Sequence, residues 1–262
     1  MNYRHAFHAG NFADLVKHAL LLALIAGRPP GVAPLTVVES HAGAGLYDLG
    51  DGPAQASREA QAGIGRLLAE PEPPAAFAPL VRIVRALNRG PTARLYPGSP
   101  LLAWRTLRRG DRWRGFELRR EEAAALKALA RREAPQGIDV QAEAGDGFAG
   151  GITALPAQGK GLLLIDPPFE RGDDYLRSAE LARAARARNP DVAVAIWTPL
   201  KDLDTFDRFL TALREAAAGG FAAQARLRPL SDPLKMNGCA MTVLGAPEAA
   251  LSPPPSAATS WS

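Results

Sequence analysis

The stretch Gly161-Leu162-Leu163-Leu164-Ile165-Asp166-Pro167-Pro168-Phe169 decides the fold: it is an apolar strand that ends in an acid, two prolines and an aromatic residue. Proline lacks a backbone N–H and has a fixed φ, so the two prolines end the strand and stiffen the loop after it. On both sides of this strand, segments with strand patterns alternate with segments of helical spacing. Such alternation implies βαβ units and predicts an α/β fold with a doubly wound, mainly parallel sheet.

The same patterns give the positions of the other elements. Further strands are predicted over residues 35–39, 113–117, 138–142, 192–197, 221–230 and 241–244. Helices are predicted over residues 12–26, 99–108, 119–133, 173–187 and 202–216. Asn11 is expected to cap the first helix, with Asp14 placed where the helix dipole favours an anion.

Residues 48–95 interrupt this rhythm. Strand signals are weak there, and helical spacing appears over 57–69 and 77–88. A chain of 262 residues fits one large domain with an inserted part better than two independent domains. We therefore expect a main domain formed by 1–47 and 96–247, a small helical insertion formed by 48–95, and a flexible tail at 248–262 that is rich in Pro, Ser and Ala.

Charge is unevenly distributed along the chain. The formal net charge is +4, but between Arg82 and Arg132 there are 13 Arg and Lys127 against 4 acidic residues, a local balance of +10. A window this basic favours a polyanionic partner, because each phosphate that a protein neutralises releases condensed counterions. The alternative is a composition bias of the genome, since Arg outnumbers Lys 26 to 5.

Composition excludes several classes of protein. A single cysteine, Cys239, excludes an internal disulfide framework and a cysteine-based zinc cluster. The longest apolar run, 19–26, is far shorter than the roughly 20 residues that span a bilayer. All 4 histidines lie within the first 41 residues, but no acidic or cysteine partner stands at metal-ligand spacing, so no metal is expected. We expect a cytoplasmic monomer without a membrane partner.

Three other strand ends carry polar or glycine-rich residues, and ligands of such sheets bind at the carboxyl ends of the strands. The turn His41-Ala42-Gly43-Ala44-Gly45 lets the backbone approach a ligand closely but lacks the dinucleotide-binding pattern. Glu117 could accept hydrogen bonds from ribose hydroxyls or be an anion at the start of a helix. Asp146 could receive an adenine amino group or cap a helix. Together they suit a nucleoside-bearing cofactor other than NAD.

Asp166 and its neighbours indicate the chemistry. Because the prolines remove backbone donors, the carbonyl beside Asp166, at Pro167, is a free acceptor. Asp166 and this carbonyl could accept both hydrogens of a planar NH2 group, while Phe169 stacks on the ring that bears it. Such a site suits an amino group conjugated to a base or an amide, whose nitrogen attacks a methyl sulfonium.

The motif Asp166-Pro167-Pro168-Phe169 resembles that of S-adenosylmethionine-dependent amino methyltransferases, which act on adenine, cytosine or a glutamine amide. The blocks 3–14 through Lys17-His18, 41–45, 96–100, 146–148 and 165–168 narrow this resemblance. Residues 2–245 thereby resemble the RlmJ family of adenine-N6 methyltransferases acting on large-subunit (23S) ribosomal RNA. The resemblance implies a Rossmann-like class I methyltransferase fold, S-adenosyl-L-methionine as methyl donor, and an unpaired or flipped adenine as acceptor.

The resemblance also implies roles for single residues. The family's cofactor-binding positions are matched by His18, His41, Ser99, Glu117, Asp146, Gly147 and Asp166. Asp166 matches the catalytic residue as well, and Tyr3 matches a tyrosine near the substrate base. Pro167 and Phe169 are expected to bind the same base. His5 and His8 could be structural or face the substrate, and the end of the insertion and the 105–114 cluster are expected to hold RNA phosphates.

The chain departs from the family pattern at two places. Phe169 replaces a common tyrosine, and Glu39-Ser40 stands where many members have Asp-Thr. The segment 231–238 follows the pattern poorly and receives no role. Two alternatives remain: an amino methyltransferase of DNA adenine or protein glutamine, or a nonenzymatic RNA-binding assembly factor. The sequence shows no separate DNA-reading module, and the intact 166–169 motif with Glu117 argues against the second alternative.

Overall fold

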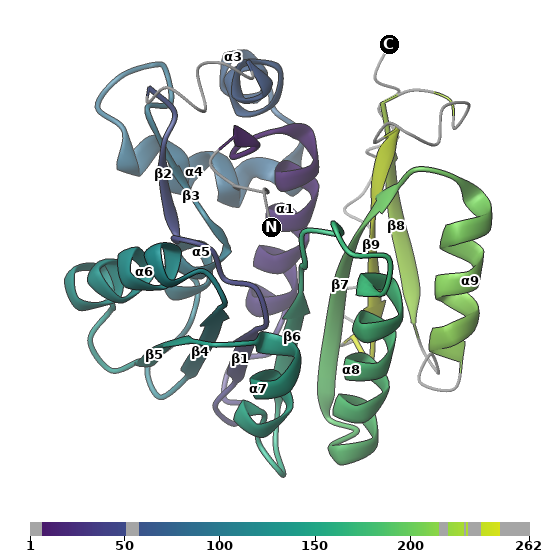
Figure 1. Ribbon diagram of the computed structural model, residues 1–262. Coiled ribbons are helices and arrows are strands. Elements are labelled where there is room, and N and C mark those ends of the chain that lie inside the picture. Colours follow the sequence, from purple (N-terminus) through teal and green to yellow (C-terminus); the bar gives the residue numbers. More distant parts are fainter. Residues whose placement is uncertain (1–6, 51–57, 215–219, 228, 230–236, 247–262) are drawn as a thin grey trace.

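The computed structural model describes residues 7–50, 58–214, 220–227, 229 and 237–246 (Figure 1). Its strands include β1 (Thr36–Glu39), β4 (Arg112–Glu117), β5 (Asp139–Ala144), β6 (Gly161–Ile165), β7 (Val192–Leu200), β8 (Phe221–Arg226) and β9 (Gly238–Leu244). These form a seven-stranded sheet in the order β5-β4-β1-β6-β7-β9-β8. Of the seven strands, β9 runs opposite to the other six, and every pair without β9 is parallel. The prediction of a mainly parallel sheet is therefore confirmed.

Helices cover both faces of the sheet, which confirms the doubly wound arrangement (Figure 1). One face packs against α1 (Phe12–Ala26), α5 (Ser99–Trp104) and α6 (Arg120–Glu133). The other packs against α7 (Gly147–Ala154), α8 (Asp174–Arg188) and α9 (Leu203–Leu213). Successive residues of a strand face opposite layers, so Leu162 and Leu164 pack under the first layer and Leu163 and Ile165 under the second.

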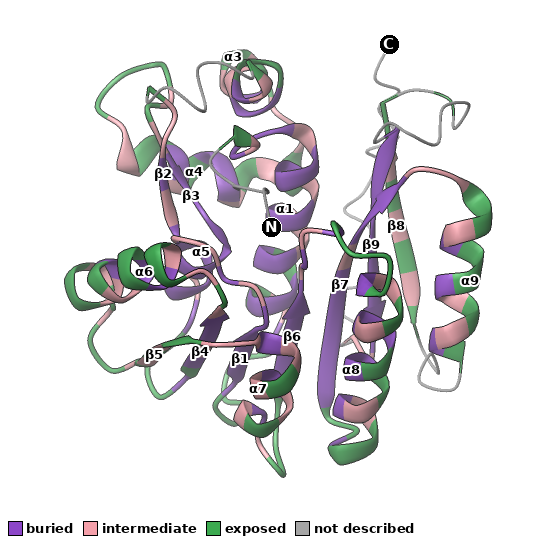
Figure 2. Ribbon diagram, in the orientation of Figure 1, coloured by how far each residue is buried: buried purple, intermediate pink, exposed green. Residues whose placement is uncertain are grey.

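Burial follows the position of each strand in the sheet, as Figure 2 shows. All five residues of β6 are buried, because both of its faces are covered and β1 and β7 flank it. The edge strands β5 and β8 instead mix exposed and half-buried residues. Among the described residues, no helix is long and apolar enough to cross a bilayer.

The insertion begins and ends with a short antiparallel ribbon of β2 (Leu46–Asp48) and β3 (Leu95–Pro97). Between these strands lie a π-helical segment (Gln61–Gly65), α3 (Arg66–Ala69), a 3-10 turn (Ala75–Phe77) and α4 (Ala78–Leu87). Their apolar residues form a core with the outer side of α1 and with α5. Helix α1 is therefore held between the sheet and the insertion, and we propose the insertion's boundaries at residues 48 and 95.

Several predicted elements have different ends. The helix predicted over 99–108 ends at Trp104, and the strand predicted over 221–230 ends at Arg226. The ribbon of β2 and β3 was not predicted, since two three-residue strands carry no visible alternation and pair across the whole insertion. Part of the predicted helices 57–69 and 202–216, and the tail at 248–262, lie outside the described residues.

Gly63 lets the insertion pack closely on the turn before α1. The Ile64 N–H donates a hydrogen bond to the Gly10 carbonyl at 2.8 Å, and a Cβ on Gly63 would lie 2.1 Å from that oxygen. We predict that Gly63→Ala lowers the free energy of unfolding by about 1–3 kcal/mol, because backbone must move to admit the methyl group. Urea denaturation measures this. Gly90→Ala is the control, since a Cβ there meets nothing within 4 Å; equal losses in both variants would contradict the prediction.

Candidate active site

A cavity of about 370 Å³ lies at the carboxyl ends of β4, β1, β6 and β7. After β1 the chain continues to β4 on one side of the sheet, whereas after β6 it continues to β7 on the other side. The strand order therefore reverses between β1 and β6, and open α/β sheets bind ligands at such a switch point. Of the predicted site residues, the cavity is lined by His18, His41, Ser99, Glu117, Asp166, Pro167 and Phe169. Residues on four strand ends and on α1 and α5 thus converge on one space.

Three predicted site residues are not in this lining. Tyr3 lies outside the described residues. Asp146 caps α7 by accepting the Phe148 N–H at 2.9 Å and also accepts Nη2 of Arg177 at 2.8 Å. A Cβ on Gly147 would lie 1.7 Å from the Ser40 carbonyl oxygen, so this glycine permits close backbone packing beside the His41 turn. The cofactor roles of Asp146 and Gly147 stay predictions.

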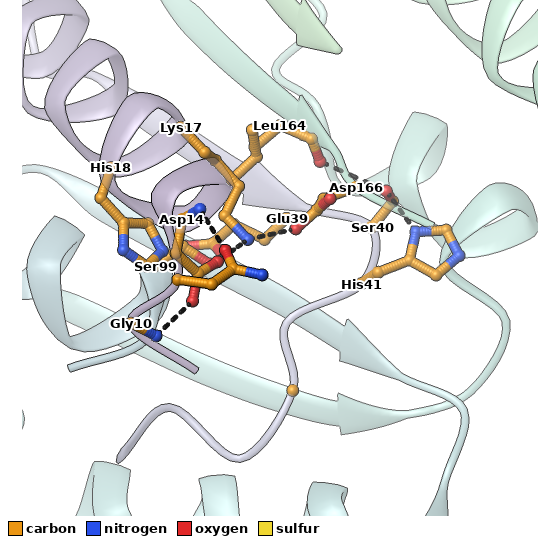
Figure 3. A network of polar contacts seen from close by, with 12 residues as sticks. Gly10, Asp14, Lys17, His18, Glu39, Ser40, His41, Ser99, Leu164 and Asp166 are labelled. Carbon is orange, nitrogen blue, oxygen red and sulfur yellow. Dashed lines mark hydrogen bonds and ion pairs between the residues drawn. The ribbon is translucent and has the colours of Figure 1, made fainter. Parts of the chain in front are cut away.

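The centre of the site is a buried ion-pair network that sequence reasoning missed (Figure 3). Lys17 Nζ lies 2.6 Å from Asp166 Oδ2 and 2.8 Å from Asp14 Oδ1, and the lysine side chain is only 5% exposed. Burial alone would lower the pKa of Lys17, but the carboxylates of Asp14 and Asp166 outweigh it and hold the pKa well above its usual value. Lys17 is therefore a permanent cation that fixes the Asp166 carboxylate at the cavity wall.

A sequence signal for this network exists. Asp14 and Lys17 are three residues apart, hence on one side of the otherwise apolar helix α1, and charged residues are rarely buried unless paired. The helix-dipole argument explains Asp14 only as an anion at a helix N-terminus. The predicted cap is confirmed, because the side chain of Asn11 accepts the Asp14 N–H at 3.0 Å. The Asp14 carboxylate additionally accepts the Gly10 N–H at 3.0 Å, which shapes the turn before α1.

Glu39, one of the departures from the family pattern, is fully buried beneath the cavity. Its carboxylate accepts the Trp113 indole N–H at 2.7 Å and the Ser99 hydroxyl at 2.6 Å. Burial raises the pKa of Glu39 to about 7, although the two hydrogen bonds and the nearby Lys17 oppose this rise. Glu39 thus joins β1 to β4 and to the first residue of α5, and it orients the Ser99 hydroxyl.

On the β4 side, the cavity wall consists of hydrogen-bonding groups. The Glu117 carboxylate accepts the N–H groups of Gly43 at 2.9 Å and Arg119 at 2.8 Å, and burial raises its pKa. Each carboxylate oxygen has a second lone pair, so a ligand hydroxyl can still bind there. Gly43 has a φ of +63°, and a Cβ on it would meet the Tyr47 hydroxyl at 2.3 Å. Only glycine keeps this turn open and close to a ligand.

His41 and His18 complete this side of the cavity. Burial lowers the pKa of His41 to about 4, so its ring is neutral near pH 7 despite the nearby Asp166 and Asp146. Its Nδ1 lies 2.8 Å from the Ser40 hydroxyl. His18 is fully buried, and its Nδ1 lies 2.8 Å from the Tyr96 hydroxyl. The hydrogen bonds of both rings fix their orientation at the cavity wall, and the His41 ring is neutral there.

On the β7 side, the loop after Asp166 presents an aromatic surface. Phe169 has a φ of +51°, which is a strained left-handed conformation for a residue other than glycine. Phe169 is 8% exposed. The centroid of its ring lies 4.6 Å from that of Tyr175 and 5.8 Å from that of Trp197. Among the described residues, no N–H donates to the Pro167 carbonyl. Asp166, Pro167 and Phe169 thus line one side of the cavity together, and their roles toward the substrate stay predictions.

His8 also lines the cavity, where it joins the main domain to the insertion. Its Nδ1 lies 2.9 Å from Oε2 of Glu59, and the same oxygen accepts Nδ2 of Asn11 at 3.0 Å. The hydrogen bond that His8 donates to the Glu59 carboxylate raises the pKa of His8 against the opposing effect of burial. His5 and most of the segment 231–238 lie outside the described residues.

Part of the basic window between Arg82 and Arg132, the 105–114 cluster, lies at the amino edge of the sheet. Arg112 is the first residue of β4, so the 105–114 cluster lies toward the amino ends of the strands, away from Asp166. Arg105 pairs with Glu133 at 2.7 Å, Arg114 pairs with Asp139, and Arg108 donates to the Arg28 carbonyl. The cluster thus lies at the edge of the sheet opposite Asp166, with three of its five arginines already bonded, and the RNA track along 105–114 stays a prediction.

Within the described part of the chain, no group of three or more His, Cys, Asp or Glu side chains is arranged to hold a metal ion. The buried carboxylates of the site instead face Lys17, Ser99 and backbone N–H groups. The carboxylates of the site are therefore held by hydrogen bonds and by the ammonium of Lys17.

Glu39 makes the stability of the fold pH-dependent. Its pKa rises from the ordinary 4.5 to about 7 on folding, so its favourable contribution is complete below about pH 4.5 and is lost as the pH rises through about 7. Glu39→Gln stays neutral and can still bond Trp113 and Ser99. We predict that from pH 5 to 8.5 the wild type loses about 1–3 kcal/mol more unfolding free energy than this variant. Urea denaturation measures the unfolding free energy of both proteins at the two pH values. An equal change in wild type and Glu39→Gln would contradict the prediction.

Comparisons with known proteins agree with this geometry. The family model described as "Ribosomal RNA large subunit methyltransferase D, RlmJ" matches residues 32–252. A protein named Ribosomal RNA large subunit methyltransferase J from Escherichia coli (strain K12) is 33% identical over 201 residues, 76% of this chain and 70% of that protein. One of the same name from Haemophilus influenzae is 30% identical over 94% of this chain and 88% of its own length.

A solved structure gives the same result for the fold. The crystal structure of a protein from Legionella pneumophila superposes with a TM-score of 0.82 at 30% identity, over 92% of this chain and 87% of that one. The match to the family model covers more than half of the chain, and the fold agrees with the Rossmann-like class I methyltransferase fold that the sequence resemblance implied. The chain therefore belongs to the RlmJ family of ribosomal RNA large subunit methyltransferases.

Proposed function

We propose that this protein transfers a methyl group from S-adenosyl-L-methionine to the exocyclic N6 amino group of an adenine in large-subunit (23S) ribosomal RNA. The observation that carries the proposal is the Asp166 carboxylate, held 2.6 Å from buried Lys17 beside the Pro167 carbonyl and the Phe169 ring, all lining one cavity. The names of the relatives support ribosomal RNA as the substrate. An enzyme acting on DNA or protein, or a nonenzymatic assembly factor, is not favoured.

The β4 side of the cavity fits the cofactor. The glycine turn at Gly43 brings backbone close to a ligand, and Glu117 has lone pairs left for ribose hydroxyls. Ser99, oriented by Glu39, and the rings of His18 and His41 supply further contacts. When bound, S-adenosylmethionine supplies a methyl group that its sulfonium already activates, so the protein has mainly to position the reactants.

The β7 side fits the amino group and its ring. The Asp166 carboxylate and the Pro167 carbonyl accept the two N–H bonds of the amino group, which directs its nitrogen lone pair toward the methyl donor. Phe169, backed by Tyr175 and Trp197, packs on the adenine ring. A base inside a helix cannot enter such a cavity, so the adenine is unpaired or flipped out, which costs a few kcal/mol of unstacking.

Lys17 holds the Asp166 carboxylate in the position that this role requires. The carboxylate accepts a hydrogen bond from the amino group and afterwards the proton that the methylated amino group loses. Lys17 supplies the compensating charge, and Asp14 holds Lys17 from its other side at 2.8 Å. We further propose that the protein acts as a monomer in the cytoplasm, where its single cysteine would stay reduced.

Asp166→Ala should abolish methyl transfer while the cofactor still binds. We predict a fall of at least about 100-fold in incorporation of labelled methyl groups into transcribed ribosomal RNA, because a group that holds the reacting amino nitrogen is lost. Calorimetry with S-adenosylmethionine should show affinity within about tenfold of the wild type. Asp173→Ala, a surface aspartate paired with Arg171 at 2.9 Å, is the control. Substantial turnover by Asp166→Ala would refute the proposed role.

Lys17→Met should also impair activity, because the Asp166 carboxylate then loses the cation that holds it. The substitution leaves Asp14 and Asp166 buried without their cation, and breaking a buried pair typically costs about 3–5 kcal/mol. We predict at least a tenfold loss of kcat in protein that circular dichroism shows to be folded, with Lys17→Arg retaining the charge as a comparison. If folded Lys17→Met methylates RNA at the wild-type rate, the pair is not needed for the reaction.

A further inference from the structure

The cavity contains one lysine whose ammonium makes no direct ion pair with the described residues. Its lining includes three Lys or Arg side chains: Lys17, Arg119 and Lys201. Lys17 is enclosed by two carboxylates, and Arg119 follows the Glu117 strand end on the β4 side. Lys201 follows the last residue of β7, and its ammonium makes no hydrogen bond or ion pair within the part of the chain that the structure describes.

The carboxylates nearest to Lys201 in the sequence are already bonded elsewhere. Asp202 caps α9, with one oxygen accepting the Thr205 N–H at 2.7 Å and the other the Thr205 hydroxyl at 3.0 Å. Asp204 pairs with Arg208 at 3.0 Å. Asp202 acts on Lys201 only at long range, and neither carboxylate forms an ion pair with its ammonium, which can therefore bind an anionic ligand in the cavity directly.

The backbone at Lys201 is held in place, which makes this cation part of a formed site. The side chain of buried Asn237 donates to the Lys201 carbonyl at 3.0 Å, and its N–H donates to the Leu200 carbonyl at 3.0 Å. These bonds tie the start of β9 to the end of β7, next to Pro199 and Trp197. The lysine stem therefore starts from a fixed point at the cavity rim.

The position of Lys201 indicates which ligand it binds. It shares the β7 side with Phe169, Trp197 and Pro199, whereas the glycine turn and Glu117 line the β4 side. Given the proposed function, on which this inference rests, the β7 side receives the target nucleotide. The anionic groups of a nucleotide in RNA are its phosphates, and lysine binds phosphate as a compact point charge.

We propose that Lys201 is a substrate-binding residue whose ammonium contacts a backbone phosphate of the target nucleotide. A phosphate contact fixes the position of the strand without reading a base, so it holds the flipped nucleotide while Asp166 engages the amino group. The contact offsets part of the cost of unstacking the adenine. It also places RNA across the carboxyl edge of the sheet at β7, on the edge opposite the 105–114 cluster.

The test compares Lys201→Met with Lys201→Arg and with Lys160→Met. Lys160 precedes β6 at the amino edge and pairs with Asp191 at 2.8 Å, so it is a matched lysine remote from the cavity. Steady-state methylation of transcribed large-subunit ribosomal RNA gives KM and kcat, and calorimetry gives the affinity for S-adenosylmethionine. Fluorescence anisotropy of a labelled RNA fragment, recorded over a series of KCl concentrations, gives the salt dependence of RNA binding.

For Lys201→Met we expect KM for RNA to rise about tenfold, the loss typical of one charge-assisted hydrogen bond, with a much smaller change in kcat. The slope of log affinity against log salt should fall by about 0.7, the value for one phosphate of a single strand. Lys201→Arg should restore most of the RNA affinity, and Lys160→Met should match the wild type. Affinity for S-adenosylmethionine should not change.

Three results would overturn the inference: unchanged RNA affinity and salt slope in Lys201→Met, a loss confined to kcat, or weakened binding of S-adenosylmethionine, which would assign the lysine to the cofactor carboxylate. Failure of the proposed function looks different, because the wild type would then bind the cofactor but methylate no ribosomal RNA. In that case the anisotropy measurement still decides whether Lys201 contacts an RNA phosphate.

Discussion

The site depends on one buried lysine between two carboxylates. Lys17 joins the first turns of α1 to Asp166 at the end of β6, residues that are 149 positions apart in the chain. Burying a single charge costs several kcal/mol, so Lys17, Asp14 and Asp166 are stable there only as a set. This requirement fixes where α1 begins relative to the sheet. Packing of the insertion on the outer side of α1 holds the helix in that position.

Around this network, the two sides of the cavity have different chemistry. The β4 side offers backbone, carboxylate and neutral imidazole groups, which suit a nucleoside. The β7 side offers an aromatic cluster around Phe169 and the charge of Lys201, which suit a base and a phosphate. Asp166 stands between them. The strained backbone at Phe169 is the kind of local cost that folded proteins accept at functional positions.

Much of the fold was predictable because strand and helix periods are local properties of the sequence. The apolar run before Asp166 and the polar residues at the ends of β1, β4 and β6 identified the carboxyl edge. The ribbon of β2 and β3 was missed because its pairing crosses the whole insertion. The bonds from Glu39 to Ser99 and Trp113 span 60 and 74 residues, so no local pattern contains them.

The RNA track expected at 105–114 stays a prediction, and its place in the fold shows a different limit of sequence patterns. Charge density along the sequence does not say at which end of a strand a residue lies, and Arg112 begins β4 rather than ending it. The direction of β4 places these arginines at the amino edge of the sheet, whereas Asp166 lies at the carboxyl edge. The Lys17 network shows the complementary limit, since pairing of Asp166 with a residue of the first helix needs the three-dimensional sheet order.

The most direct test of the central claim is a double-mutant cycle between Lys17→Met and Asp166→Asn, measured as kcat/KM for methylation of ribosomal RNA. If Lys17 acts by holding the Asp166 carboxylate, removing the lysine after the carboxylate charge is gone should cost little. The double variant should then be about as active as Asp166→Asn alone. Fully additive losses would show that the two residues act independently, which would contradict this account of the site.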